Sequence, residues 1–529
     1  MRSQIHQLVS AAAERAPDAP AVTYKQDTVS YAELWRRLEE FAGMLAGLAL
    51  RRGDRVAVYL DKRIETVVAL FGSSAGDCVF VPVNPLLRAQ QVGYILRDCG
   101  VKVLVTSPER LELLRGELAE SKSVEHVVLA GAGAGAARPG DRYAVHPWPV
   151  RPAASGDVPV PQAIDIDMAA ILYTSGSTGS PKGVVLSHRN LLAGAASVSS
   201  YLGNTADDVI LSALPLSFDA GFSQLTTGFE VGAHVILHNY LLPADLVRLC
   251  AQHRVTGLTG VPPLWIQVAG QDWPAEASAT MRYFANTGGR MPRATLDKLR
   301  AIFGSARPFL MYGLTEAFRS TYLDPAEVDR RPDSIGKAIP NAEILVVRPD
   351  GSLCEPGEEG ELVHRGALVA MGYWNDPERT AERFRPAPAR EPGLCSDDIA
   401  VWSGDAVVRD AAGFLYFVGR NDEMIKTSGY RVSPTEVEEV AYETGLVRDV
   451  VALGLPDPVL GQHVVLVVSP PMSAAPGQDG TVDTDGVLAA MKKVLPAYMV
   501  PRRIEVRTEI PRSPNGKFDR AGLRAELTA

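Results

Sequence analysis

The chain has 529 residues, of which 46% are hydrophobic and 22% are charged, a composition typical of a soluble globular protein. A single core rarely exceeds about 250–300 residues, so the length predicts at least two domains. The formal net charge of −9 gives no electrostatic reason to expect nucleic acid or anionic lipid as a partner.

Neither the cysteines nor the amino terminus indicates export. The first 20 residues carry neither an apolar secretory segment nor a twin-arginine signal. The most apolar stretch, 67–83, is interrupted by Asp77 and is shorter than the roughly 20 apolar residues of a membrane span. Scattered cysteines without metal-ligand spacing predict reduced thiols. They are Cys78, Cys99, Cys250, Cys354 and Cys395. We therefore expect a cytoplasmic protein with no membrane span.

The first 130 residues alternate between helical and strand patterns. Helices are expected over 31–48 and 64–75. Buried strands are expected over 55–60, 79–83, 101–106 and 126–130. Such alternation predicts an α/β architecture with a parallel sheet. Residues 131–162, rich in Ala, Gly and Pro, are expected to form a surface connector.

The rest of the chain predicts three further units. A second α/β region is expected from Asp165 to about Pro340, and short strand-like runs with Gly, Pro and Asp turns begin at Ile344. After Gly419-Arg420 a last unit mixes helices and strands and has the size of a small domain. We expect an α/β protein. Its large N-terminal domain, 1–421, would hold two α/β sheet subdomains and a β-rich subdomain, and 422–529 would form a small, mobile α+β domain.

The segment 171–188, ILYTSGSTGSPKGVVLSH, carries the clearest chemistry. A strand-like run over 169–173 leads into a loop of Ser, Thr and Gly with Lys182, and a helix-like stretch is expected after the loop. Glycines let backbone N–H groups approach a phosphate, hydroxyls add donors, and lysine adds a cation. The loop does not fit GxxxxGK[ST], which excludes a P-loop. By composition alone, such a loop is more often a plain turn.

The motif TSGSTGSPKG resembles the phosphate loop of the adenylate-forming superfamily, which contains acyl-CoA synthetases, adenylation domains of nonribosomal peptide synthetases and firefly luciferase. Eight blocks of this kind occur in the family's order across nearly the whole chain. The others are YAEL (31–34), NTGG (286–289), YGLTE (312–316), GEL (360–362) with GY (372–373), SGD (403–405), GRND (419–422) with KTSGYR (426–431), and PNGK (514–517).

The resemblance implies that the protein uses ATP and Mg²⁺ to activate a carboxylic acid. Because a carboxylate and a triphosphate repel each other, such a site needs concentrated cations and oriented donors. The residues implied to hold the phosphates are Thr174, Ser175, Gly176, Ser177, Thr178, Gly179, Lys182 and Thr315. Glu316 is implied to bind Mg²⁺, which prefers oxygen ligands. Those implied to surround the adenosine are Gly288, Gly289, Arg290, Tyr312, Asp405 and Arg420.

The resemblance also implies a moving catalytic lysine. Lys517 would offset the charge that develops at the α-phosphate during adenylation, although a lysine near a carboxy terminus is by itself most often a solvated surface charge. Asp422 corresponds to the hinge about which the small domain rotates. Gly429 would line the path of a pantetheine thiol.

The segment 214–222, LPLSFDAGF, and the residues around YGLTE suggest the acid. Phe218 and Asp219 resemble adenylation domains of peptide synthetases, in which this aspartate binds the substrate's amino group; the alternative is that Asp219 caps the following helix. Met311, Arg319 and Ser320 flank YGLTE, a region that lines the acyl pocket in the family. Arg319 would pair with a second acidic group, the alternative being a structural or surface ion pair.

These features predict a small amino acid as substrate, such as a β-amino acid or an amino diacid. The chain resembles the stand-alone β-amino-acid adenylation enzymes of macrolactam pathways, which belong to natural product biosynthesis. The acceptor would be the phosphopantetheine thiol of a separate carrier protein. The alternative is an acyl-CoA synthetase that uses free coenzyme A. A luciferase-like oxygenase and a non-catalytic scaffold are further alternatives, and the lack of a GxSxG elbow disfavours a hydrolase.

Overall fold

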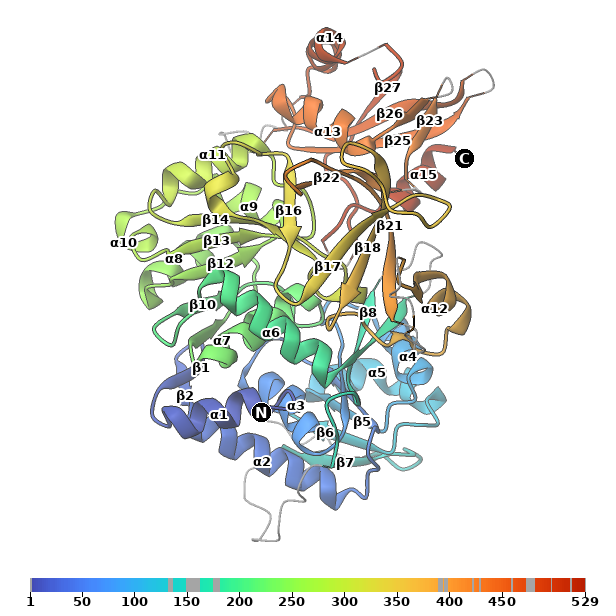
Figure 1. Ribbon diagram of the computed structural model, residues 1–529. Coiled ribbons are helices and arrows are strands. Elements are labelled where there is room, and N and C mark those ends of the chain that lie inside the picture. The colour runs from blue at the N-terminus through green and yellow to red at the C-terminus, as the bar shows by residue number, and fades with distance from the viewer. Residues whose placement is uncertain are drawn as a thin grey trace.

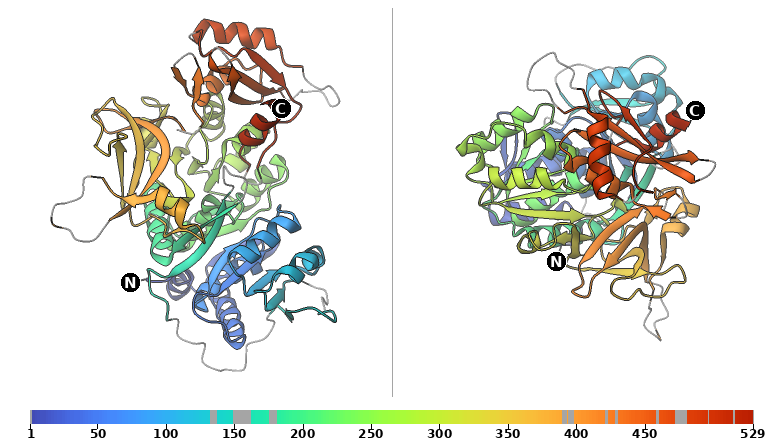
Figure 2. Two further views of the ribbon diagram at one scale, coloured as in Figure 1. Left: turned by 90° about the vertical axis from the view of Figure 1, so that its right-hand side faces the viewer. Right: turned by 90° about the horizontal axis from the view of Figure 1, so that it is seen from above.

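The computed structural model describes residues 2–131, 137–148, 162–174, 181–388, 393, 398–420, 423–427, 430–457, 460–471, 481–495, 497–513 and 516–528. The fold is mixed α/β, with a large N-terminal domain of sheets and helices and a smaller C-terminal domain, as expected (Figure 1). Seen from above, the C-terminal domain lies over the middle of the large domain (Figure 2).

An eight-stranded sheet forms the first part of the large domain. Its order is β19-β9-β8-β4-β3-β5-β6-β7. The strands are β3 (Arg55–Tyr59), β4 (Val79–Pro82), β5 (Val103–Thr106), β6 (His126–Leu129), β7 (Ala144–Pro147), β8 (Met168–Thr174), β9 (Lys182–Ser187) and β19 (Gly372–Tyr373). Pairing is parallel from β8 through β4, β3, β5 and β6 to β7, as the alternating pattern predicts. The associated helices are α2 (Tyr31–Gly47), α3 (Ile64–Ala75), α4 (Ala89–Asp98) and α5 (Pro108–Glu120).

Two expectations about this sheet were wrong. The stretch after the Gly-rich loop is not helical, because β9 pairs antiparallel with β8 and the helix begins only at His188. Its Val-Val-Leu run fills a buried strand, and Ser187 accepts a hydrogen bond from the amide of Asn190 as the N-cap of the next helix. The connector 131–162 also contains β7, which extends the sheet at its edge.

A fourteen-stranded sheet forms the rest of the large domain. Its parallel part comprises β1 (Pro20–Tyr24), β10 (Val209–Ser212), β11 (His234–Leu237), β12 (Gly257–Gly260), β13 (Tyr283–Asn286) and β14 (Arg307–Tyr312). Its antiparallel strands are β2 (Asp27–Ser30), β15 (Thr321–Leu323), β16 (Ser334–Ala338), β17 (Ala342–Val347), β18 (Glu359–Gly366), β20 (Phe384–Pro386), β21 (Ile399–Arg409) and β22 (Leu415–Arg420). The second α/β region and the β-rich region thus share one continuous sheet.

Helices and short 3₁₀ turns connect these strands. The helices are α1 (Gln7–Arg15), α6 (His188–Leu202), α7 (Asp219–Val231), α8 (Pro243–His253), α9 (Pro262–Val268), α10 (Ala275–Ser278), α11 (Arg293–Ile302) and α12 (Pro377–Arg383). The 3₁₀ turns are η1 (Thr315–Ala317) and η2 (Pro325–Glu327). In the described residues no helix has the length and apolarity needed to cross a membrane. Four cysteines are buried and unpaired, and Cys395 lies outside the described residues.

The C-terminal domain has its own sheet and core. The strands are β23 (Ile425–Thr427), β24 (Tyr430–Val432), β25 (Asp449–Asp457), β26 (Gly461–Ser469) and β27 (Arg503–Val506). The helices are α13 (Pro434–Glu443), α14 (Thr484–Val494) and α15 (Arg520–Thr528). Apolar side chains of α13, α14, β25 and β26 form a separate core. The expected boundary at 421/422 lies outside the described residues.

The parallel part of the large sheet brings the family motifs together. The carboxyl ends of parallel strands meet at one edge of a sheet, where ligands commonly bind. Gly260 of β12 is in register with Asn286 of β13, and Asn286 with Leu310 of β14. The loops that begin after β12, β13 and β14 therefore start at one edge.

Candidate active site

A lysine, a glutamate and a tyrosine from three distant segments meet beside the Gly-rich loop. Lys182 Nζ, at the start of β9, donates to Glu316 Oε1 at 2.9 Å and to the Tyr373 hydroxyl at 2.7 Å. The Tyr373 hydroxyl donates to Glu316 Oε1 at 2.6 Å. Because β19 pairs with β9, Tyr373 lies opposite Val184. No role was predicted for Tyr373 from the sequence, although it lies in a family block.

The Glu316 carboxylate is held in its ionised form. Burial alone would raise its pKa, but the Lys182 cation and the hydrogen bonds from Tyr373 and Lys182 outweigh burial and lower the pKa to about 2. The carboxylate side chain is only 12% exposed. The described residues contain no group of three or more His, Cys, Asp or Glu side chains that could hold a metal ion.

Thr174 ends β8 directly opposite Lys182 in the β8–β9 register. Its hydroxyl Oγ1 is buried and has no hydrogen-bond partner in the described part of the chain. A buried hydroxyl normally has a hydrogen-bond partner, so we expect one from a ligand or from residues outside the described part of the chain. The other predicted loop residues, Ser175, Gly176, Ser177, Thr178 and Gly179, lie outside the described residues.

The residues expected around adenosine follow β13 and β14. The Tyr312 hydroxyl donates to Asp405 Oδ2, so the two predicted residues are in contact, and Asp405 is buried. Gly288 has φ +74°, and both Gly288 and Gly289 are exposed. Asp405 of β21 is in register with Arg420 of β22, whose side chain lies outside the described residues.

Arg290 makes contacts that were not predicted from the sequence. Its guanidinium donates to Asp333 at 2.7 Å and forms an ion pair with Glu439 of α13. The loop that contains Gly288 is therefore connected directly to the C-terminal domain. Arg293, the first residue of α11, also binds Asp333, at 2.8 Å.

Lys517 is exposed, and its ammonium forms no hydrogen bond or ion pair with any residue that the structure describes. The structure thus does not bring it into contact with Glu316, Thr315 or Asp405. Thr315 and Glu316 both lie in η1. Asp422 and Gly429 lie outside the described residues, so their expected hinge and thiol-path roles stay predictions.

The two charged residues expected in the acid pocket bind each other. Arg319 Nη1 lies 2.6 Å from Asp219 Oδ2 and also donates to the Phe318 carbonyl at 2.7 Å. Asp219 does not cap α7, because Phe218 occupies the N-cap position and no side-chain cap bond forms there. Phe318 has φ +58°, a strained conformation for a residue with a side chain.

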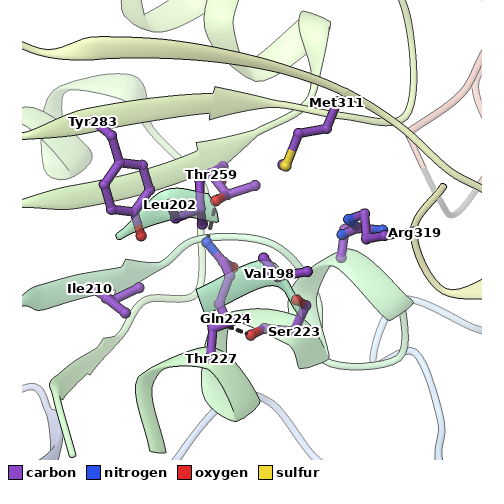
Figure 3. A pocket seen from close by; sticks show the side chains of 11 residues that line it. Val198, Leu202, Ile210, Ser223, Gln224, Thr227, Thr259, Tyr283, Met311 and Arg319 are labelled. Carbon is purple, nitrogen blue, oxygen red and sulfur yellow. Dashed lines mark hydrogen bonds between the residues drawn. The ribbon is translucent and has the colours of Figure 1, made fainter. Parts of the chain in front are cut away.

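Arg319 of this ion pair also lines a small cavity (Figure 3). Arg319 and Met311 reach it from the β14 end of the sheet, and Ser223 and Gln224 reach it from α7 (Figure 3). The remaining lining residues are Val198, Leu202, Ile210, Ala220, Thr227, Thr259 and Tyr283. Of the predicted substrate residues, Met311 and Arg319 line the cavity and Asp219 touches Arg319.

Ser320 is fully buried and lies 2.9 Å from His364 Nδ1, so it does not line the cavity. Burial lowers the pKa of His364 to about 3, so this imidazole is neutral at physiological pH. The α7 residues Ser223 and Gln224 were not predicted from the sequence. The helical spacing of residues 220, 223, 224 and 227 from Asp219 was the signal that could have found them.

Comparison with known proteins identifies the family. Residues 9–374 match the AMP-binding enzyme family, and residues 436–517 match the AMP-binding enzyme C-terminal domain. The chain belongs to the AMP-binding enzyme family. As a member of this family it is an adenylate-forming acid–thiol ligase, which confirms the resemblance drawn from the eight sequence blocks.

Relatives of this AMP-binding enzyme include two functional groups. A feruloyl-CoA synthase of Amycolatopsis sp is 30% identical, with 97% of this chain and 96% of the relative covered. A linear gramicidin synthase protein of Brevibacillus parabrevis is 28% identical over 98% of this chain, but only 6% of that much longer protein is covered.

The fold also matches solved structures. MatB from Rhodopseudomonas palustris with ATP bound is 25% identical, with 99% of both chains covered and a TM-score of 0.84. Apo MatB from the same organism is also 25% identical, with 100% of this chain and 99% of that chain covered, and has a TM-score of 0.76. The structure of this AMP-binding enzyme thus superposes better on ATP-bound MatB than on apo MatB.

Proposed function

We propose that this enzyme activates a small amino acid as its acyl-adenylate, with release of pyrophosphate, and transfers the acyl group to the phosphopantetheine thiol of a separate carrier protein. The observation that carries the adenylation step is the contact of Lys182, Glu316 and Tyr373 beside the buried hydroxyl of Thr174, which has no partner among the described residues. A cation, an ionised carboxylate and a hydroxyl donor at one place are what a Mg²⁺–triphosphate complex requires.

The residues fit ATP and Mg²⁺. Thr174 would donate its hydroxyl to a phosphate oxygen, Lys182 would add positive charge, and Glu316 would offer its carboxylate to Mg²⁺. When bound, the ion would neutralise phosphate charge. The predicted loop 175–179 and Thr315 would complete the phosphate contacts. Tyr312, Gly288, Gly289, Arg290, Asp405 and Arg420 would surround the adenosine.

Lys517 would enter the site by a domain rotation. We place the hinge at Asp422, between a domain of residues 1–421 and a mobile domain of residues 422–529, with Gly429 on the thiol path in the second step. The better match to ATP-bound MatB supports an arrangement suited to adenylation. Exposure of the Lys517 ammonium without a partner among the described residues is compatible with a ligand role.

Pyrophosphate exchange tests the adenylation step. The wild-type enzyme would be assayed for acid-dependent exchange with a broad acid library, beside Lys517→Ala and Lys493→Ala, a second exposed lysine of the C-terminal domain. We expect Lys517→Ala to lose at least about a hundredfold in rate and Lys493→Ala to match the wild type. Full exchange by Lys517→Ala would refute the assignment of the lysine.

The acceptor requires its own assay. The Asp219 carboxylate, which binds Arg319 of the cavity lining, supports an amino acid, and amino-acid activation favours a carrier protein. The second candidate is coenzyme A, which the 30% identity to a feruloyl-CoA synthase favours. Isolated acyl-adenylate would be offered coenzyme A or holo-carrier protein, with thioester formation followed by mass spectrometry. Rapid thioester formation with coenzyme A alone would replace the carrier-protein proposal.

A further inference from the structure

Arg319 forms part of the wall around the cavity, and Asp219, next to the lining residue Ala220 in α7, is its ion-pair partner. The side chain of Arg319 is 2% exposed and that of Asp219 is 16% exposed. Besides Asp219 and the Phe318 carbonyl, Arg319 has a buried Nε atom that bonds to no described residue. Apolar and uncharged polar side chains make up the rest of the cavity lining. Arg319 is therefore the one charged side chain among the described residues that line the cavity, and the Asp219 carboxylate that binds it balances its charge.

This balance limits which substituents an acid can bring into the cavity. A substituent that carries only an ammonium group would bind Asp219 and leave Arg319 buried without its counter-ion. A substituent that carries only a second carboxylate would bind Arg319 and leave Asp219 without a partner. Removing one partner of a buried ion pair costs free energy, because the other charge stays buried without a counter-ion. Singly charged substituents are therefore penalised.

A substituent with one group of each sign avoids this penalty. Its ammonium would pair with Asp219, and its carboxylate would pair with Arg319, so one protein ion pair is exchanged for two pairs to the ligand. Arginine binds carboxylates through two parallel N–H donors, and the unpartnered Nε gives Arg319 a donor that Asp219 does not use. An uncharged substituent would leave this buried donor unsatisfied.

Resting on the proposed adenylation function, we propose that the Arg319–Asp219 pair acts as one specificity element that selects an amino dicarboxylic acid. One carboxyl group reacts, and the ammonium and the second carboxylate replace the two partners of the ion pair. The two residues are specificity determinants, because they contact the part of the acid that does not react.

Two matched acid series test this selection by pyrophosphate exchange. The four-carbon series is butyrate, 3-aminobutyrate, succinate and aspartate, and the five-carbon series is pentanoate, 3-aminopentanoate, glutarate and 3-aminoglutarate. Within each series only the charged groups differ. We expect kcat/KM for the amino diacid of one series to exceed that of each singly charged acid by at least about tenfold. A wild-type preference for a singly charged or uncharged acid would overturn the proposal.

Variants of Asp219 and Arg319 should change which acid the enzyme prefers. Asp219→Asn leaves Arg319 without its counter-ion. The kcat/KM for the diacid, divided by that for the amino diacid, should rise by at least about tenfold. Arg319→Gln should raise the corresponding ratio for the amino monoacid by a similar factor. Arg330→Gln, an exposed arginine at 79% exposure, is the matched control and should leave every ratio unchanged. Unchanged ratios in Asp219→Asn and Arg319→Gln would overturn the proposal.

Each single variant leaves one buried charge and could fold poorly, so the double variant Asp219→Asn/Arg319→Gln is included. It should keep the wild-type KM for ATP and lose the preference for the amino diacid over the uncharged acid. A double variant that keeps this preference would also overturn the proposal. Absence of exchange with every acid in the wild-type enzyme is a different result, because it would refute the proposed adenylation function itself.

Discussion

At the scale of single residues, Glu316 links stability to pH. Its pKa falls from 4.5 to about 2 on folding, because Lys182 and Tyr373 outweigh the opposing effect of burial. A depressed carboxyl pKa stabilises the folded state above pH 4.5, and this stabilisation is lost as the pH falls toward 2. Glu316→Gln removes the charge and should lower the melting temperature at pH 7, by an amount that shrinks below about pH 4.

Thermal melts of both proteins from pH 7 to pH 3 measure this effect. Glu378→Gln, which replaces an exposed glutamate in α12, is the control and should melt with the wild type at each pH. A destabilisation by Glu316→Gln that stays constant down to pH 3 would contradict the pKa argument.

Tyr373 positions both charged groups, because its hydroxyl contacts Lys182 Nζ and Glu316 Oε1. Tyr373→Phe keeps the ring on which Lys182 Nζ rests, 4.2 Å from the centroid, and removes only the hydroxyl. We expect a roughly tenfold loss in kcat/KM for ATP, of the size of one hydrogen bond to a charged group, with little change in the KM for the acid. Steady-state pyrophosphate exchange measures both kcat/KM for ATP and the KM for the acid. A larger change in the KM for the acid than in kcat/KM for ATP would contradict this role.

The sequence predicted which residues belong to the site better than it predicted which of them contact each other. The motifs assigned Lys182 and Glu316 to the Mg²⁺–phosphate site and Tyr312 and Asp405 to the adenosine, and the structure brings the two members of each pair into contact. A structural ion pair was the alternative considered for Arg319, but its partner Asp219, 100 positions away at the start of α7, could not be identified from the sequence. Ser320 follows Arg319 in sequence but points to His364, since the backbone turns at Phe318.

At the scale of elements, the first turn of α7 fits tightly against the preceding loop. A Cβ atom at Gly221 would lie 1.9 Å from the Pro215 carbonyl oxygen, so α7 would have to shift. Gly221→Ala should lower stability by about 1–3 kcal/mol and raise the KM for the acid, because Asp219 lies in the same turn. Gly43→Ala in α2 is the matched control, since its Cβ would meet nothing within 4 Å.

Denaturant melts and exchange kinetics of both variants test this prediction. We expect Gly43→Ala to be neutral or to stabilise by about 0.4–1 kcal/mol, because alanine restricts the unfolded chain. Equal melting curves for the two variants would show that α7 adjusts without cost.

The elements that could be predicted were those with strong periodicity. Helix α3 has the expected bounds, 64–75, because its residues are mostly apolar or small and it ends before a glycine. Strand β9 was taken for a helix, because a short apolar run such as Val184-Val185-Leu186 fits either structure until its partner strand is known. Strand β7 was missed because it is an edge strand whose residues are exposed or half-buried and show no apolar alternation.

At the scale of the whole molecule, a large and a small domain could be predicted from the sequence, but their arrangement could not. Composition shifts mark where a core ends, whereas relative orientation depends on a few surface contacts between domains. Here one such contact is the ion pair between Arg290, after β13, and Glu439 of α13. Because Arg290 also binds Asp333, the contact joins α13 to the loop expected to flank adenine.

The Arg290–Glu439 ion pair should affect the two half-reactions, adenylation and thiol transfer, differently. If the small domain rotates between them, a contact formed in the arrangement that resembles ATP-bound MatB stabilises adenylation over thiol transfer. A partly exposed ion pair such as this one contributes about 0.5–1 kcal/mol, or a two- to fivefold change in populations. Glu439→Gln should therefore slow pyrophosphate exchange about two- to fivefold and leave thioester formation from isolated acyl-adenylate unchanged or faster.

The control is Glu436→Gln, which replaces an exposed glutamate of the same helix and should alter neither rate. Because salt screens such pairs, the difference between Glu439→Gln and wild type should also shrink as the salt concentration rises from about 0.05 M to about 0.5 M. An equal slowing of both half-reactions would mean that the pair only stabilises the fold.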